Sequence, residues 1–229
     1  MKTIIVLGTW SSGSGAVSDY LTSRREVINP YGVNEFKIVS DPRGLNYLYN
    51  NCYFKKDLLL SSHVFQEFKK YISKVQQYQV YTSKGKKKII YKKNINILAD
   101  KFLKEITYFK YYGLPHFKSS NLEFKEKILL KFKRKFTKKS IPELKILPIV
   151  TPVEKKIFVK KAKKFILNII KSSTNKKIKD RMLLLNNGAD ICDPVNSTKY
   201  YHNPKIICVT RDPRDIYCGM KMRQAGSTP

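Results

Sequence analysis

The stretch Thr3-Ile-Ile-Val-Leu-Gly-Thr-Trp-Ser-Ser-Gly-Ser-Gly-Ala-Val-Ser-Asp-Tyr20 decides the fold. Residues 3–7 form a β-rich apolar run, residues 8–15 are almost all small, and residues 16–25 can continue as a helix. The order of strand, glycine-serine turn and helix predicts an α/β domain with a P-loop-like parallel sheet flanked by helices.

This turn is predicted to hold a phosphate. Backbone N–H groups at the helix N-terminus converge on one point, and the helix dipole favours negative charge there. The spacing of Gly8 and Gly13 is that of a P-loop, but Ser14 and Gly15 stand where a P-loop has Lys and Ser or Thr. The turn therefore lacks the lysine that ATP or GTP hydrolases and kinases use. A plain glycine-serine turn is the alternative.

Composition indicates a folded, strongly basic protein. The 229 residues are 42% hydrophobic and 12% aromatic, which suits one α/β domain with or without an insertion. The net charge of +29, from 46 Lys and Arg against 17 Asp and Glu, indicates attraction to nucleic acid, anionic lipid or a charged glycan. Lysine accompanied by abundant Asn, Ile and Tyr is also what an AT-rich genome would produce.

The cysteines and the hydropathy indicate a cytoplasmic protein. No CxxC spacing is present, and the histidines are widely separated, so no metal site is predicted. The N-terminal apolar run is too short for a signal peptide, and no run approaches the ~20 residues of a membrane span. Peripheral contact with the inner membrane face through charge is compatible with this location. The cysteines expected to be reduced thiols are Cys52, Cys192, Cys208 and Cys218.

Residues 52–181 are predicted to form a lysine-rich helical insertion between two parts of one α/β core, residues 1–50 and 182–229. Lysine faces on structural helices and a polyanion-binding surface are equally good interpretations of this region. A small hairpin (78–82 with 88–91), a helix (95–112) and a linker (141–152) are also expected. Three apolar stripes at helical spacing indicate packed helices: Leu58, Phe65, Phe68, Ile72, Val75; Ile128, Leu129, Phe132, Phe136; Phe158, Ala162, Phe165, Ile166, Ile169.

A second strand is expected at residues 26–29, followed by a short run at 34–40 and a turn at 41–44. The carboxyl ends of parallel strands open on one crevice, so Glu35 and this turn are candidates to face the phosphate loop. On spacing alone, an exposed loop acid is the better interpretation of Glu35.

The last fifty residues return to α/β character. Residues 182–186 and 204–210 are nearly continuous apolar runs, typical of buried parallel strands. A loop with a short helix is expected between them, at residues 187–203.

The second of these strands ends in Arg211-Asp-Pro-Arg-Asp215, and a helix should follow through Gln224. Pro213 suits the first helical turn, and the two aspartates suit its capping region. Arg211 then lies at the carboxyl tip of a strand, where its fork of donors suits bidentate binding of phosphate. Pairing with Asp215 is the alternative role.

The glycine-serine turn and Arg211 are two features suited to phosphate binding on one sheet, and together they imply a ligand with phosphates at two ends. Here the chain resembles the sulfotransferase family that uses 3′-phosphoadenosine 5′-phosphosulfate (PAPS), especially bacterial members that modify carbohydrates. The resemblance lies in Ser11-Ser-Gly-Ser-Gly15, in Ile206-Ile-Cys-Val-Thr-Arg-Asp-Pro-Arg-Asp215 and in Leu184-Leu-Asn-Asn-Gly188. It covers roughly residues 1–50 and 180–223, and its second motif is the more specific.

The resemblance implies transfer of a sulfuryl group from PAPS, as co-substrate, to a hydroxyl of a carbohydrate-type acceptor, without a metal or a specific nucleic-acid partner. Arg211 would bind the 3′-phosphate. Glu35 is the residue that best fits the place of the catalytic base, with His63 as second choice. The residues that would bind the 5′-phosphosulfate are Ser11, Ser12, Gly13, Ser14 and Gly15.

The chain departs from the family pattern in three places. Ser11 stands where a Lys or Arg usually stabilises charge on the bridging oxygen. This electrostatic stabilisation is lost unless a lysine from the middle region enters the site. Gly219 stands where a serine usually binds phosphate. The sequence stops at Pro229, before a basic loop that usually closes over the 3′-phosphate, as expected of a fragment or a decayed copy.

Two other functions compete with sulfuryl transfer. A P-loop-like small-molecule kinase would share the fold, but the missing lysine and the lack of an evident Walker-B aspartate oppose it. A non-catalytic polyanion-binding protein with a degenerate nucleotide site would explain the changes at Ser11 and Gly219.

Overall fold

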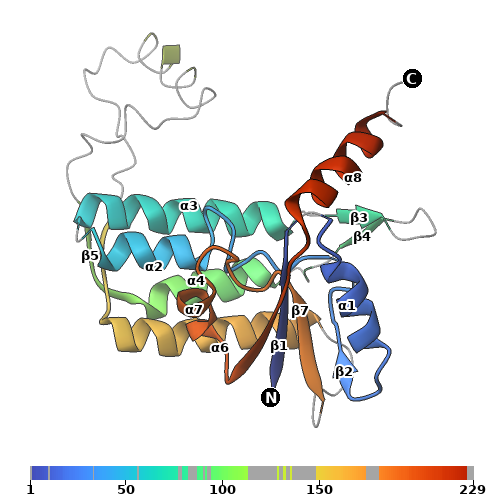
Figure 1. Ribbon diagram of the computed structural model, residues 1–229. Coiled ribbons are helices and arrows are strands. Elements are labelled where there is room, and N and C mark those ends of the chain that lie inside the picture. The colour runs from blue at the N-terminus through green and yellow to red at the C-terminus, as the bar shows by residue number, and fades with distance from the viewer. Residues whose placement is uncertain are drawn as a thin grey trace.

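The computed structural model describes residues 2–9, 11–32, 34–55, 57–76, 79–81, 87–89, 91, 94–112, 128, 131–132, 135, 148–173 and 181–225. Within them the chain is an α/β protein, as predicted, with a four-stranded parallel sheet flanked by helices (Figure 1). The sheet order is β2-β7-β1-β8. These strands are β1 (Thr3–Gly8), β2 (Val27–Ile28), β7 (Met182–Asn186) and β8 (Pro204–Val209).

Strand β1 lies inside the sheet because it pairs with β7 on one side and β8 on the other. All six of its residues are buried. Alternation sends Ile5 and Leu7 into the large core and Ile4 and Val6 into a smaller core, which also contacts Val17 of the first helix. The apolar run at residues 3–7 therefore forms the strand that the sequence predicts, and the structure shows that this strand is buried.

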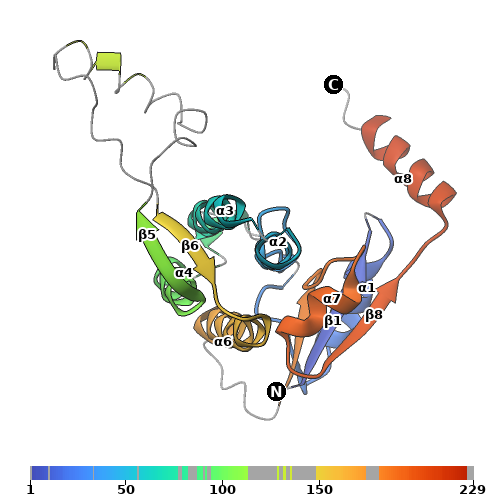
Figure 2. The same cartoon turned by 90° about the vertical axis from the view of Figure 1, so that its left-hand side faces the viewer.

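Helices cover the two faces of the sheet unequally. Figure 1 shows α2 (Leu45–Tyr53), α3 (Leu58–Gln76), α4 (Ile95–Glu105) and α6 (Lys155–Ser173) on one side, and α1 (Ser14–Thr22) on the other; Figure 2 shows the first four in end-on view. All five residues of the predicted stripe on α6 are buried. On α3, the stripe residues Phe65, Phe68 and Ile72 are buried, but Leu58 is exposed. Of the predicted middle stripe, Leu129 and Phe136 lie outside the described residues, and Ile128 and Phe132 are exposed.

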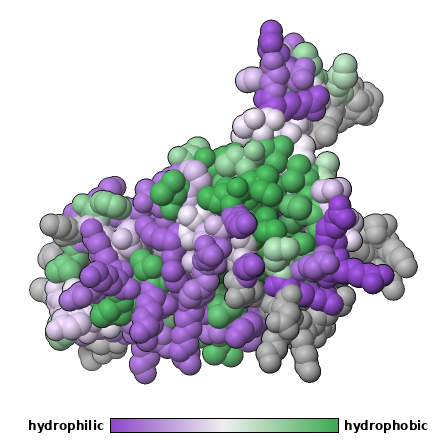
Figure 3. Space-filling view, turned by 60° about the horizontal axis from the view of Figure 1, so that its bottom comes forward, coloured by the Kyte–Doolittle hydropathy of each residue, from purple (hydrophilic) through white to green (hydrophobic). Residues whose placement is uncertain are grey.

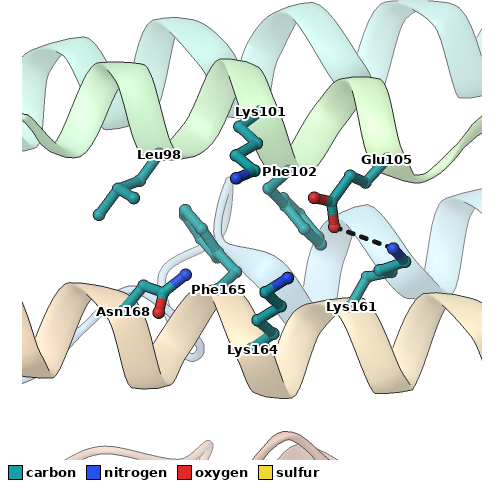
Figure 4. Close-up of a pocket in the computed structure, with 8 residues that line it drawn as sticks. All are labelled: Leu98, Lys101, Phe102, Glu105, Lys161, Lys164, Phe165 and Asn168. Carbon is teal, nitrogen blue, oxygen red and sulfur yellow. Dashed lines mark ion pairs between the residues drawn. The ribbon is translucent and has the colours of Figure 1, made fainter.

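Lysines surround an aromatic contact between α4 and α6. The rings of Phe102 and Phe165 stack with centroids 4.6 Å apart and planes 12° apart. Glu105 pairs with Lys161 at 3.1 Å, and Lys101 and Lys164 lie beside them (Figure 4). The crevice between these side chains holds only about 20 Å³, room for little more than one water molecule. At this place the lysines form a solvated rim over a structural core.

Two predicted segments have a different structure. The helix expected at residues 95–112 ends at Glu105, and Thr107–Tyr112 is strand β5, rich in aromatic residues that favour strands. The linker expected at 141–152 includes strand β6 (Pro148–Pro152), which pairs antiparallel with β5. Residues 141–147 lie outside the described residues. Each strand depends on a partner about forty residues away, which local periodicity does not reveal. The predicted hairpin is confirmed as β3 (Gln79–Tyr81) and β4 (Lys87–Ile89).

Strand β8 is not buried, contrary to prediction. It lies at the end of the sheet, where Ile206 and Cys208 are exposed and Ile207 and Val209 are half-buried. The following helix, α8 (Pro213–Ala225), leads away from the body of the molecule (Figures 1 and 2). Figure 3 shows hydrophobic residues gathered at the base of this projecting helix. The sequence of a strand does not reveal whether another element will cover it.

The remaining predictions concern short elements and thiols. The loop after β7 contains α7 (Pro194–Ser197) and a 3-10 turn, η1 (Thr198–Tyr200), in place of the single short helix expected. All four cysteines are free, and burial raises the pKa of the Cys52 thiol to about 12. Among the helices described here, none is both long and apolar enough to cross a bilayer.

Candidate functional site

An open cleft of about 550 Å³ lies at the carboxyl ends of β1 and β7. Three segments line it: the β1–α1 loop, residues 35–40, and the residues that follow β7. This is the edge of a parallel sheet where ligands usually bind. Three predicted site residues, Ser11, Ser14 and Glu35, are brought together here. The lining residues are Gly8, Thr9, Ser11, Ser14, Glu35, Lys37, Ser40, Asn187, Ala189, Asp190 and Ile191.

The β1–α1 loop turns tightly and presents a helix N-terminus. Ser11 and Gly13 have left-handed backbones, with φ of 59° and 94°. Helix α1 begins at Ser14, and no side chain caps its N-terminus. A Cβ at Gly8 would lie 2.3 Å from Ser12 Oγ and 2.5 Å from Ser14 Cβ, so the loop can fold over this residue only because it is glycine. The uncapped N–H groups are therefore available to an anion.

The Ser12 hydroxyl lies buried under this loop and has no hydrogen-bond partner among the described residues. The backbone N–H of the same residue donates to the Thr9 carbonyl at 3.1 Å. A buried hydroxyl without a partner costs about 1–3 kcal/mol. The loop therefore holds an unused donor, although Ser12 itself does not line the cleft.

Two asparagines after β7 tie the sides of the cleft together. Asn187, with φ of 46°, accepts a hydrogen bond from Gly8 N at 3.1 Å and donates one to Glu35 Oε1 at 2.7 Å. Asn186 accepts a hydrogen bond from the Ser18 hydroxyl and donates to the Gly32 carbonyl at 3.1 Å. Neither asparagine is among the residues predicted from the sequence to act at the site. Their position directly after an apolar strand run is the signal that could have found them.

Glu35 faces the cleft but does not end a strand. Its segment contacts the sheet through an isolated parallel bridge to Asn186. Partial burial raises the pKa of Glu35, but hydrogen bonds from Lys37 and Asn187 and the charge of Lys37 outweigh that effect and lower it overall. The carboxylate is ionised at neutral pH and able to accept a proton, although a low pKa makes it a weaker base.

Lys37 contributes a charge to the site that is not predicted from the sequence. Its Nζ lies 2.6 Å from Glu35 Oε2, and it lines the cleft with Ser11 and Ser14. Among the described lining residues, Lys37 is the one cation, against the two acids Glu35 and Asp190. No sequence signal marks this lysine among so many others.

Arg211 lies beside the β1–α1 loop without lining the cleft. Its Nη1 donates to the Ser11 carbonyl at 3.5 Å, and its Nε lies 3.6 Å from Asp215 Oδ2. Arg211 therefore contacts the predicted phosphate loop and also forms the alternative ion pair with Asp215, and both contacts are long. Neighbouring Arg214 is held more closely by Asp212, with nitrogen–oxygen distances of 3.0 and 2.7 Å. Arg211 thus has the weaker contacts of the two and can more easily turn to a ligand.

His63, the second choice for the base, belongs to α3 and does not line this cleft. Gly219 lies on the projecting α8. Within the described part of the chain, no group of three His, Cys, Asp or Glu could hold a metal ion. Compared with known protein families, curated proteins and solved structures, the chain matches none.

Proposed function

We propose that the chain is a sulfotransferase that moves a sulfuryl group from PAPS to a hydroxyl of a carbohydrate-type acceptor, using the cleft beside the β1–α1 loop. The observation that carries this proposal is the meeting of two anion-binding features at Ser11. The uncapped N-terminus of α1 follows this residue, and Arg211, 200 positions later in the sequence, contacts its carbonyl. In this proposal the sheet is P-loop-like and the lysine-rich middle is an insertion.

The loop fits the 5′-phosphosulfate end of PAPS in two respects. The α1 N-terminus offers backbone donors and a favourable dipole. Gly8 permits the tight fold of the loop. Arg211, on the other side of Ser11, would hold the 3′-phosphate with its guanidinium fork.

The proposed step is an in-line displacement. Glu35, as the ionised base, accepts the proton of the acceptor hydroxyl while the hydroxyl oxygen bonds to sulfur. The bond between sulfur and the 5′-phosphate oxygen breaks, and the charge left on that oxygen is stabilised by the loop N–H groups. PAPS supplies the activated sulfuryl group, and no metal takes part in this proposal.

Calorimetric titration with adenosine 3′,5′-bisphosphate in the absence of Mg²⁺ tests the nucleotide site. We expect saturable binding that weakens at least about tenfold in Arg211→Ala, because a charge-assisted contact is lost. Arg214→Ala is the matched control, since that arginine is adjacent but held by Asp212. Absence of binding by the wild-type protein, or equal loss in both variants, would overturn the proposal. If nucleotide binding requires Mg²⁺, the alternative function as a small-molecule kinase is favoured.

A non-catalytic polyanion-binding protein is the second candidate. It is favoured by the excess of acids over lysines in the cleft lining and by exposed lysines on α6, such as Lys156 and Lys160. It predicts steeply salt-dependent binding to a nucleic acid or anionic glycan that adenosine 3′,5′-bisphosphate does not affect. Peripheral contact with anionic lipid would follow the same salt dependence.

A further inference from the structure

An anion that enters the cleft meets an unfavourable balance of charge. The described lining residues include two carboxylates, Glu35 and Asp190, and one ammonium group, Lys37. The helix N-terminus contributes only about half a positive charge. A phosphate or sulfonate held here needs a full cation close by, because charge repulsion is strong where solvent is partly excluded.

Lys37 is held at the cleft by a series of contacts. Its Nζ pairs with Glu35 Oε2, and the other carboxylate oxygen of Glu35 accepts a hydrogen bond from Asn187 Nδ2. Asn187 in turn accepts a hydrogen bond from Gly8 N at the start of the loop. The position of the ammonium group is therefore linked to the loop that would hold the anion.

The ion pair leaves Lys37 able to move. The lysine side chain is 59% exposed and has a flexible four-carbon stem. An ion pair this exposed typically contributes no more than about 1 kcal/mol, so its exchange for another anionic partner costs little. Glu35 is also held by a second hydrogen bond, from Asn187.

We propose that Lys37 is the anion-binding cation of the cleft, held ready by Glu35 and transferring its contact to the bound phosphate or sulfonate oxygens. This inference rests on the proposed function for the identity of the anion. Before binding, Glu35 has a positioning role, because it holds Lys37. Once the anion is bound, the Glu35 carboxylate is released from Lys37.

Transfer of this contact changes the acidity of Glu35. The charged and polar groups near it are Lys37 on its own segment, Asn187 after β7, and Asp190 in the same lining. Loss of the Lys37 contact removes the hydrogen bond and the charge of Lys37, which lower the pKa of Glu35, whereas the hydrogen bond from Asn187 remains and partial burial continues to raise the pKa. Glu35 therefore becomes a stronger base when the anion is in place, which links binding to proton transfer.

The test compares Lys37→Met with Lys69→Met. Lys69 is a close match: its Nζ lies 2.7 Å from Asp100 Oδ1, its side chain is also 59% exposed, and it belongs to α3. Pyrophosphate and adenosine 3′,5′-bisphosphate are titrated by calorimetry against both variants and the wild-type protein. We expect Lys37→Met to weaken binding at least about tenfold, Lys69→Met to leave it within about twofold, and Lys37→Arg to restore most of it.

A second measurement follows the Glu35 carboxyl carbon by NMR across a pH titration. We expect adenosine 3′,5′-bisphosphate to raise its pKa in the wild-type protein, and Lys37→Met to have an already raised pKa that the nucleotide increases by a smaller amount, through its own negative charge alone. A role of Lys37 in structure alone would not produce this dependence on the ligand.

The outcomes separate this inference from the proposed function. If the wild-type protein binds both probes and Lys37→Met binds them equally well, the inference is wrong and the proposed function stands. If pyrophosphate binds in a Lys37-dependent manner but the nucleotide does not bind, the inference stands and the PAPS site is wrong. If the wild-type protein binds neither probe, both are overturned.

Discussion

Strands β7 and β8 pair with opposite sides of β1 and have similar apolar sequences, but only β7 is buried. Ile5 of β1 is in register with Leu185 on β7 and with Ile206 on β8. Leu185 is 0% exposed, whereas Ile206 is 37% exposed. The difference shows that the burial of a strand depends on its place in the sheet and on what covers it, as much as on its own residues.

The contrast extends to the loops that follow the two strands. The end of β7 is fixed to the β1–α1 loop and to residue 35 by Asn187. The end of β8 leads to Arg211, whose contacts are 3.5 and 3.6 Å long, and to the projecting α8. The proposed nucleotide site therefore has one firmly held side and one loosely held side.

Truncation of Leu185 and Ile206, which flank Ile5 in the sheet, should give the largest difference in the free energy of unfolding. Leu185→Ala leaves a cavity in the large core and should lower the free energy of unfolding by about 2–5 kcal/mol. Ile206→Ala removes a partly solvated side chain and should cost about 1 kcal/mol. Urea unfolding measures both. Equal losses would mean that another surface covers β8 in solution.

The next effect compares two asparagines with left-handed backbones, Asn187 after β7 and Asn203 before β8, with φ of 46° and 43°. Replacement by alanine strains both backbones alike, but Asn187→Ala also breaks the bonds to Gly8 and Glu35. We expect Asn187→Ala to cost about 1–3 kcal/mol more than Asn203→Ala in urea unfolding. A difference near zero would show that the Asn187 contacts do not stabilise the site.

The charge on Glu35 should have a smaller effect that depends on pH. Its pKa is lowered by folding, so its stabilising contribution is present above the unfolded pKa and is lost as pH falls through the folded value. Glu35→Gln should therefore cost about 0.2–1 kcal/mol at pH 7, and this cost should shrink as the pH falls through the lowered pKa of Glu35. Urea unfolding at pH 7 and at a series of lower pH values checks this, and a cost that does not decrease in acid would contradict it.

The smallest effect is expected on β8. Cys208 is exposed and should react rapidly with a thiol reagent, as should Cys192 and Cys218, whereas buried Cys52 should react only on unfolding. A small adduct on Cys208 should change stability by no more than about 0.5 kcal/mol. The number of rapidly reacting thiols should fall by one in Cys208→Ser, which identifies the reactive residue. Slow reaction of Cys208 would contradict the solvent exposure of β8.

The sequence was sufficient for the elements whose signals are local. The run at residues 3–7, the turn after it and the stripe on α6 each have a periodicity or composition that determines their structure. Strands β5 and β6 were missed because their pairing joins distant segments. Lys37 was missed for the same kind of reason, since only the folded chain places it beside the loop.

The outer edge of β8 has one more consequence, for the behaviour of the protein in solution. No strand pairs with this edge in the described structure, so its backbone donors and acceptors can accept a strand from another molecule. Mutual repulsion between molecules with a net charge of +29 opposes such pairing at low ionic strength. Salt shortens the range of that repulsion to about 3 Å at 1 M. Light scattering should therefore detect more self-association as salt is added, the opposite of what salt does to complexes held together by charge.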